Sequence, residues 1–170
     1  MGQGAYTMLS QICAHELGLP LSHVSVAAPD THAAPFCLGS LASRVTVIAG
    51  HAAQRAAREA RQKLLEVAAA KLAATLDELE MAEGLIRVKN APERKATLGE
   101  IARLHTFRHG GEGLLVHASY DAPTVMHDAN YHGNIAPAYS FAAQGVEVEV
   151  DTETGQVTVV EIGRASCRER

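Results

Sequence analysis

The chain of 170 residues has no tryptophan, only seven other aromatic residues and three cysteines, and it carries no excess of positive charge. Three scattered cysteines form neither a disulfide framework nor a zinc-binding pattern. A net charge of −4 does not favour non-specific binding of nucleic acid. No apolar run reaches the roughly 18 residues of a membrane helix, and no charged, then apolar leader precedes a cleavage site. We therefore expect a cytoplasmic protein without a membrane span.

What the chain does contain is a large share of small apolar side chains. Hydrophobic residues make up 47% of the sequence, which argues against intrinsic disorder, and 30 residues are alanine. Alanine lets backbones pack closely against each other or against a large ligand, whereas few aromatic side chains are there to fill a core. This composition fits one domain of ordinary size, and equally a segment of a larger protein.

The apolar periodicity predicts helices mixed with short strands. A first helix follows Gly4 and ends at Gly18, and a long helical stretch covers residues 41–79 with Ser40 as its N-cap. A short helix is expected to end near Leu104. Alternating apolar residues predict strands over residues 23–28, 84–89, 114–120, 139–150 and 156–162, of which the last two form a hairpin. The expected fold class is α+β.

Two glycine-rich segments at predicted helix starts are candidates for a binding site. In Gly2-Gln3-Gly4, the glycines allow the backbone to approach a ligand, and the helix start behind them favours an anion. The Gln3 amide offers both a donor and an acceptor, which suits a heterocycle with mixed edges such as a pterin. The alternative is that this Gly-x-Gly is only a turn before a helix.

The second segment, Leu38-Gly39-Ser40-Leu41-Ala42-Ser43-Arg44, also opens a predicted helix. Its serine hydroxyls could cap that helix or bind phosphate, and Arg44 adds a cation with a planar fork. A capped helix with a surface arginine is the alternative. If the two segments converge on one anionic ligand, they suggest a nucleotide-like cofactor.

Histidine and cysteine form no catalytic or metal-binding motif. None of the nine histidines belongs to a helical pair with a glutamate between, and His105 and His109 flank an expected helix end. His127 and His132 lie in a predicted loop, where surface histidines are a simpler interpretation than a metal site. Cys37 is interpreted as a packing residue. We assign no catalytic and no metal-binding residue.

Several ordered segments together resemble the large subunit of the molybdenum hydroxylases. They are Met1-Gly2-Gln3-Gly4 with Thr7 and Gln11, Glu16-Leu17-Gly18-Leu19-Pro20, Asp30-Thr31 with Pro35, Gly39-Ser40-Leu41-Ala42-Ser43-Arg44, Ala49-Gly50-His51-Ala52, Tyr139-Ser140-Phe141-Ala142-Ala143-Gln144, and Glu147-Val148-Glu149-Val150-Asp151 with Thr154-Gly155. This family includes xanthine dehydrogenase, aldehyde oxidase, carbon monoxide dehydrogenase and 4-hydroxybenzoyl-CoA reductase. The resemblance covers about residues 1–162.

The resemblance implies that residues 1–162 are part of the second molybdopterin-binding domain of a chain several times longer. It implies molybdopterin with molybdenum as the cofactor, in bacteria often in the cytosine dinucleotide form. By the same resemblance, the pterin is lined by Gly2, Gln3 and Gly4. Backbone N–H groups and a serine hydroxyl contact the cofactor at Ala42, Ser43, Arg44 and Val45.

For the parent protein, the resemblance implies an oxidoreductase that hydroxylates a carbon centre, or reductively dehydroxylates it in the benzoyl-CoA reductase branch. A molybdenum-bound hydroxide attacks the carbon, hydride passes to a sulfido ligand, and electrons leave through iron–sulfur clusters and FAD, often on partner subunits. The family's catalytic glutamate lies beyond this segment, and none of Glu16, Glu147 or Glu149 matches it. The chain alone is therefore expected to be inactive. A free-standing α+β ligand-binding module without redox activity is the alternative.

The last eight residues, 163–170, interrupt the strand pattern with three arginines, a glutamate and a cysteine. Together with Ile162 they look like the translation of a sequencing adapter beyond a DNA insert, and an ordinary basic tail is the alternative. The expected organisation is thus a partial cofactor-binding domain over residues 1–162, followed by a tail without a biological role.

Overall fold

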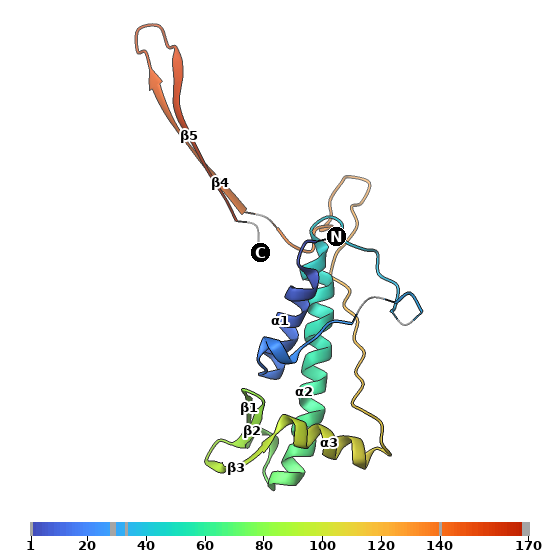
Figure 1. Cartoon of the computed structure of the whole chain (residues 1–170). Helices are drawn as coiled ribbons and strands as arrows, with labels where there is room; N and C mark the ends of the chain where they lie inside the picture. The colour runs from blue at the N-terminus through green and yellow to red at the C-terminus, as the bar shows by residue number, and fades with distance from the viewer. Residues whose placement is uncertain (1, 28–29, 33, 140, 168–170) are drawn as a thin grey trace. The chain divides into compact units, whose positions relative to one another are not determined.

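The structure is a computed structural model that describes residues 2–27, 30–32, 34–139 and 141–167. It divides into two units, Met1–Ala122 and Pro123–Arg170, and each is described by itself (Figure 1). Helices and antiparallel strands are mixed along the chain, so the expected α+β class is confirmed. No helix in the described ranges is long and apolar enough to cross a membrane.

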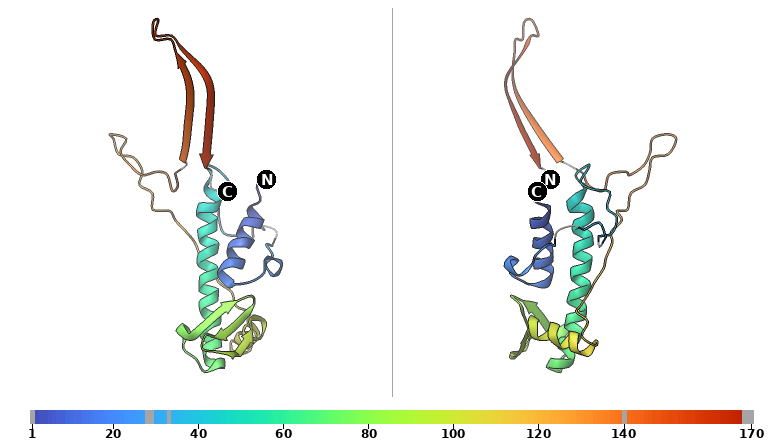
Figure 2. Two further views of the ribbon diagram at one scale, coloured as in Figure 1. Left: turned by 90° about the vertical axis from the view of Figure 1, so that its left-hand side faces the viewer. Right: turned by 45° about the vertical axis from the view of Figure 1, so that its right-hand side comes forward.

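Two helices, α1 (Ala5–Leu17) and α2 (His51–Leu72), lie side by side in the first unit (Figure 2). α1 ends as predicted at Gly18, which adopts the left-handed conformation typical of a helix C-cap, with φ +59°. The strand predicted over residues 23–28 is wrong for residues 23–27, which are the part of it that the structure describes. A 3-10 turn, η1 (Leu21–His23), is followed there by backbone that pairs with no described strand, and Ala28 lies outside the described residues.

The long helix predicted over residues 41–79 is wrong at both ends. A six-residue π-helical turn, η2 (Val45–Gly50), precedes α2, and Ser40 does not cap it. α2 stops at Leu72 because Ala73 takes the left-handed conformation, with φ +48°. The apolar spacing continues beyond that point, but it belongs to a 3-10 turn, η3 (Leu76–Glu78), and to the first strand.

Three short strands form an antiparallel meander, β1 (Leu79–Ala82), β2 (Leu85–Val88) and β3 (Ala91–Thr97), and the helix α3 (Leu98–Arg108) follows directly. Of these strands the sequence predicted only β2, and α3 is one turn longer than expected. The sheet, α3 and the C-terminal half of α2 enclose the core. Its buried residues are Leu64, Val67, Ala68, Leu79, Met81, Ile86, Val88, Ala96 and Ile101.

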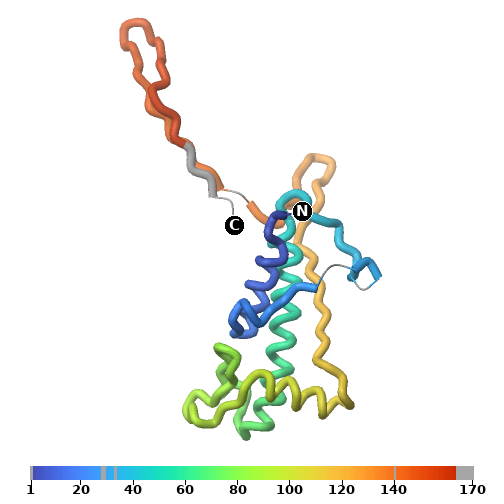
Figure 3. The backbone as a smooth tube through the Cα atoms, in the orientation of Figure 1, coloured from blue at the N-terminus to red at the C-terminus, as the bar shows by residue number. Residues whose placement is uncertain are grey.

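Residues 113–122 return alongside α2 in extended conformation (Figure 3). The strand predicted over residues 114–120 is wrong: the segment is extended, but it pairs with no strand among the described residues. Side chains hold it instead. The Tyr120 ring stacks on His51 with 4.5 Å between ring centroids, and Arg55 donates a hydrogen bond to the Ser119 carbonyl at 3.1 Å.

The second unit contains the predicted hairpin, formed by β4 (Phe141–Val150) and β5 (Val157–Cys167). Three cross-strand pairs place β-branched residues on one face, at Val146–Ile162, Val148–Val159 and Val150–Val157. All six side chains are exposed, so this face has no cover from described residues. β5 runs through Cys167, and the artificial origin of residues 163–170 stays a prediction.

Candidate functional site

The glycine-rich start of α1 lines an open hollow of about 510 Å³. Its lining comprises residues 2–7 and Ser40. Gly2 and Gly4 have φ angles of +76° and +77°, and a Cβ at either position would meet nothing within 4 Å. Gly4 is the N-cap of α1, and no side chain caps the helix there. The hollow therefore combines free space, glycine backbone and uncapped helical N–H groups, which is a suitable environment for an anion.

A side-chain hydrogen bond joins the two glycine-rich segments. The Gln3 amide nitrogen Nε2 donates to the hydroxyl Oγ of Ser40 at 2.8 Å, although the residues lie 37 positions apart in the sequence. The two segments therefore meet, whereas their convergence on one ligand and the cofactor role of their residues stay predictions. Ser40 serves as an acceptor beside Gln3 and not as the cap of a long helix.

Ala42 and Ser43 form a strained turn behind Ser40. Both adopt the left-handed conformation, with φ +48° and +56°, which costs a non-glycine residue about 1–2 kcal/mol. The Arg44 N–H closes the turn on the Leu41 carbonyl at 3.1 Å. Of the N–H groups predicted to contact a cofactor, that of Arg44 is thus already used. None of residues 42–45 lines the hollow at Gln3.

The Arg44 side chain folds back and closes its own loop. Its Nη1 donates to the Gly39 carbonyl at 3.1 Å and lies 3.9 Å from Sγ of Cys37. Cys37 is exposed, so its interpretation as a packing residue is wrong: this loop offers it polar partners and no core. The Gly39 N–H and, next, the Arg44 guanidinium lower the pKa of the Cys37 thiol.

Glu16 holds α1 against α2, a role that the sequence analysis missed. Its carboxylate accepts hydrogen bonds from Gln54 at 2.7 Å and from Nε and Nη2 of Arg58, both at 3.1 Å. Its backbone carbonyl accepts another from Arg61 at 2.8 Å. Since Gln3 lies just before α1 and α2 follows the loop of Ser40, this contact between the two helices helps to fix the relative position of both parts of the hollow. Gln54, Arg58 and Arg61 recur at helical spacing, and that was the available signal.

Glu16 is expected to make stability depend on pH. The hydrogen bond from Arg58, followed by that from Gln54, lowers the pKa of the Glu16 carboxyl in the folded chain. The unfolded chain loses these contacts, so it binds the proton more readily, and the contribution is lost as the pH falls below about 4.3. Glu16→Gln should therefore lower the free energy of unfolding by about 1–3 kcal/mol at neutral pH, and by much less near pH 3. Urea unfolding followed by circular dichroism at both pH values measures the difference.

The matched control for this experiment is Glu59→Gln. Glu59 makes one exposed ion pair with Lys63 at 2.8 Å, so its removal should cost less than about 1 kcal/mol at either pH. An effect of Glu16→Gln that is the same at both pH values would contradict the role assigned to its ionised carboxylate.

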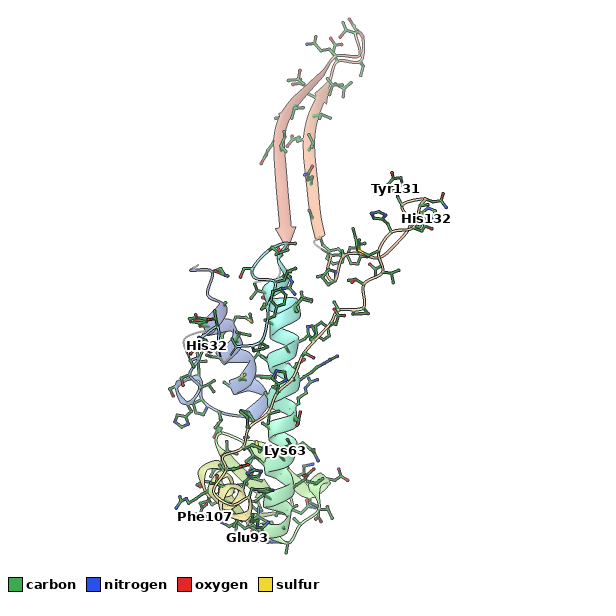
Figure 4. All side chains as sticks on the ribbon, turned by 90° about the vertical axis from the view of Figure 1, so that its right-hand side faces the viewer. His32, Lys63, Glu93, Phe107, Tyr131 and His132 are labelled. Atoms are coloured by element: carbon green, nitrogen blue, oxygen red, sulfur yellow. The ribbon has the colours of Figure 1, made fainter. Side chains whose placement is uncertain are left out.

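The histidines do not build a metal centre in the described part of the chain, where no three His, Cys, Asp or Glu side chains are arranged to hold an ion. His32 and His132 lie on loops of different units (Figure 4). His105 and His109 flank a helix end as predicted, because α3 ends at Arg108 and His109 is its C-cap; their rings stack at 4.1 Å. His105 is buried, and its Nδ1 has no hydrogen-bond partner among the residues that the structure describes.

Comparison with known families matches residues 1–164 to the molybdopterin cofactor-binding domain. Subunit gamma of the 6-hydroxypseudooxynicotine dehydrogenase complex of Paenarthrobacter nicotinovorans is 34% identical over 155 residues, covering 91% of this chain and 18% of that protein. The carbon monoxide dehydrogenase large chain of Afipia carboxidovorans is 32% identical over 159 residues, with the same two coverages. The chain thus spans about a fifth of the length of these relatives.

Solved structures give the same result. The structure of Cu,Mo-CO dehydrogenase aligns with a TM-score of 0.68 at 29% identity, over 97% of this chain and 20% of that one. Quinoline 2-oxidoreductase from Pseudomonas putida 86 aligns with a TM-score of 0.67, over 97% of this chain and 20% of that chain. Its identity of 24% supports a shared fold only.

Proposed function

Because the chain belongs to the molybdopterin cofactor-binding domain family, we propose that it forms one side of the cofactor site in the large subunit of a molybdenum-dependent oxidoreductase. The observation that carries this proposal is the hydrogen bond between Gln3 and Ser40 at 2.8 Å. It brings a polar amide and a hydroxyl from two distant glycine-rich segments to one open hollow. A cofactor with a polar heterocycle and a phosphate requires both kinds of partner at one place.

The residues at the hollow fit such a group. The space in front of Gly2 and Gly4 is open, the first turn of α1 has no side-chain cap, and Gln3 offers a donor and an acceptor. We propose that Gly2, Gln3 and Gly4 line the pterin. We assign backbone contacts to Ala42, Ser43 and Val45, and to Arg44 the closure of their loop. When bound, the group supplies a molybdenum centre that exchanges electrons with a substrate; this chain's residues bind and orient it.

The finer parts of the proposal rest on the relatives together with the family resemblance of the sequence. One of them is a subunit of a dehydrogenase complex and another is a carbon monoxide dehydrogenase large chain. We propose accordingly that the parent hydroxylates or reductively dehydroxylates a carbon centre, in the cytoplasm, with molybdopterin in its cytosine dinucleotide form. Partner subunits or domains would carry iron–sulfur clusters and FAD. No catalytic residue is assigned to this chain, so these residues alone are expected to be inactive.

Loss of the Gln3 amide is expected to weaken cofactor binding. In anaerobic equilibrium dialysis of the chain against molybdopterin cytosine dinucleotide, Gln3→Ala should lower affinity about tenfold, the equivalent of one good hydrogen bond. Bound pterin is measured by its fluorescence after oxidation. Gln62→Ala is the control, because Gln62 is exposed on α2, where its amide donates a hydrogen bond to Glu66 at 3.1 Å. Failure of the unmodified chain to bind, or equal binding by Gln3→Ala, would overturn the proposal.

A further inference from the structure

The π-helical turn η2 lies between the candidate cofactor loop and α2. It begins at Val45, the last residue assigned to the cofactor, and α2 starts directly after Gly50. A π turn accommodates an extra residue compared with an α-helical turn. If η2 relaxed to α-helix, the chain before it would rotate by about 100° around the helix axis. The register of this turn therefore decides whether Ser40 faces Gln3.

The first residue of α2 holds the π turn from one side. Nδ1 of His51 lies 2.6 Å from the carbonyl oxygen of Val47. Because a carbonyl can only accept, Nδ1 carries the proton and donates it. The imidazole is itself fixed by stacking on Tyr120, with ring planes 19° apart. The Arg55 guanidinium lies 4.7 Å from the centre of the same Tyr120 ring.

Helix α1 contacts the same turn through Gly50. Gly50 is buried, and a Cβ there would come within 3.1 Å of Cδ1 of Ile12. η2 thus contacts α1 through a glycine, while His51 ties it to the extended segment of residues 113–122. Because Gln3 precedes α1 and Ser40 precedes η2, the packing of η2 on α1 lies directly behind the hydrogen bond between these two side chains.

We propose that His51 is a positioning residue for the cofactor loop, with its Nδ1–H holding the Val47 carbonyl and Tyr120 holding the imidazole. The hydrogen bond keeps residues 45–50 in the π-helical register, and this register places Ser40 against Gln3. The cofactor-binding part of the inference rests on the proposed function. The contact between Gln3 and Ser40 tests the positioning role separately, without a cofactor.

The test compares His51→Leu, which removes the donor, with His51→Asn, whose side-chain N–H can take the place of Nδ1–H. The first readout is the nuclear Overhauser contact between the Gln3 side-chain amide and the Ser40 β protons in the 170-residue chain. The contact should persist in the unmodified chain and in His51→Asn, and disappear in His51→Leu. In dialysis against molybdopterin cytosine dinucleotide, His51→Leu should bind about tenfold more weakly, and His51→Asn within about twofold of the unmodified chain.

A second pair of variants tests the stacking, in case His51→Leu does not fold. Tyr120→Phe keeps an aromatic ring on His51 and should retain the Overhauser contact, whereas Tyr120→Leu should weaken it. Retention of the contact in both leucine variants would overturn the inference, as would equal losses in His51→Asn and His51→Leu. If the contact follows the donor while the unmodified chain binds no cofactor, the proposed function fails and the positioning role of His51 stands.

Discussion

Replacing Ile86 by alanine is expected to lower the free energy of unfolding of the first unit by about 2–5 kcal/mol. Ile86 on β2 has no solvent exposure, and it packs in a core shared by α2, α3 and the sheet. Truncation removes buried methyl groups and leaves a cavity, which a sheet of three short strands can close only in part. Urea unfolding followed by circular dichroism measures the difference.

Ile135→Ala is the matched control, because it makes the same chemical change at a residue of the second unit that is 56% exposed. Its effect should stay within about 0.5 kcal/mol. A cost below about 1 kcal/mol for Ile86→Ala would show that the sheet and α3 do not form the core described for the first unit.

Elements whose signals are local were predictable from the sequence. The first helix ends where Gly18 can adopt a left-handed C-cap, and the hairpin of β4 and β5 follows an alternation, broken by one register shift, around a glycine-containing loop. The sequence also raised the possibility that the two glycine-rich segments converge, and the bond between Gln3 and Ser40 joins them, although no ligand is part of that observation. The sequence signal for the helix end and for the hairpin lies within the element itself. For the two glycine-rich segments, the signal is their similar composition.

Elements that are defined by tertiary contacts were not predicted from the sequence. In β3 only Ala96 is buried, so the strand lacks an alternating apolar face. β1 extends the apolar spacing of α2, although the left-handed turn at Ala73 and the 3-10 turn η3 separate the two elements. The segment of residues 113–122 has the alternation of a strand, but whether it pairs depends on neighbours that its own sequence does not encode.

The candidate site divides in the same way. Gly2 and Gly4 were predicted to lie at a helix start, and both do so with positive φ, while their role and that of Gln3 at a cofactor stay predictions. The left-handed conformation of Ala42 and Ser43 was not predictable, since neither residue favours it and only the surrounding loop imposes it. The same applies to Glu16, whose partners Gln54 and Arg58 come from another helix.

Replacing Gly18 by alanine is expected to destabilise the first unit by about 2–4 kcal/mol in the same urea experiment. Gly18 has φ +59°, where a non-glycine residue is strained, and a new Cβ would lie 2.8 Å from the Met81 carbonyl oxygen. The Gly18 carbonyl also accepts the Gly84 N–H at 2.9 Å, so the end of α1 cannot move away from the sheet without losing that bond. Strain and collision therefore act together at this position.

Gly99→Ala is the control, and it should have the opposite sign. Gly99 lies in the first turn of α3, its φ is not positive, and a Cβ there would meet nothing within 4 Å. Alanine should therefore stabilise the helix by about 0.5–1 kcal/mol. Because Gly18 fixes the far end of the helix that Gln3 precedes, Gly18→Ala should also weaken the Overhauser contact between Gln3 and Ser40, and Gly99→Ala should not. Equal effects of the two substitutions would show that the junction of α1 with the sheet is not what sets the position of the hollow.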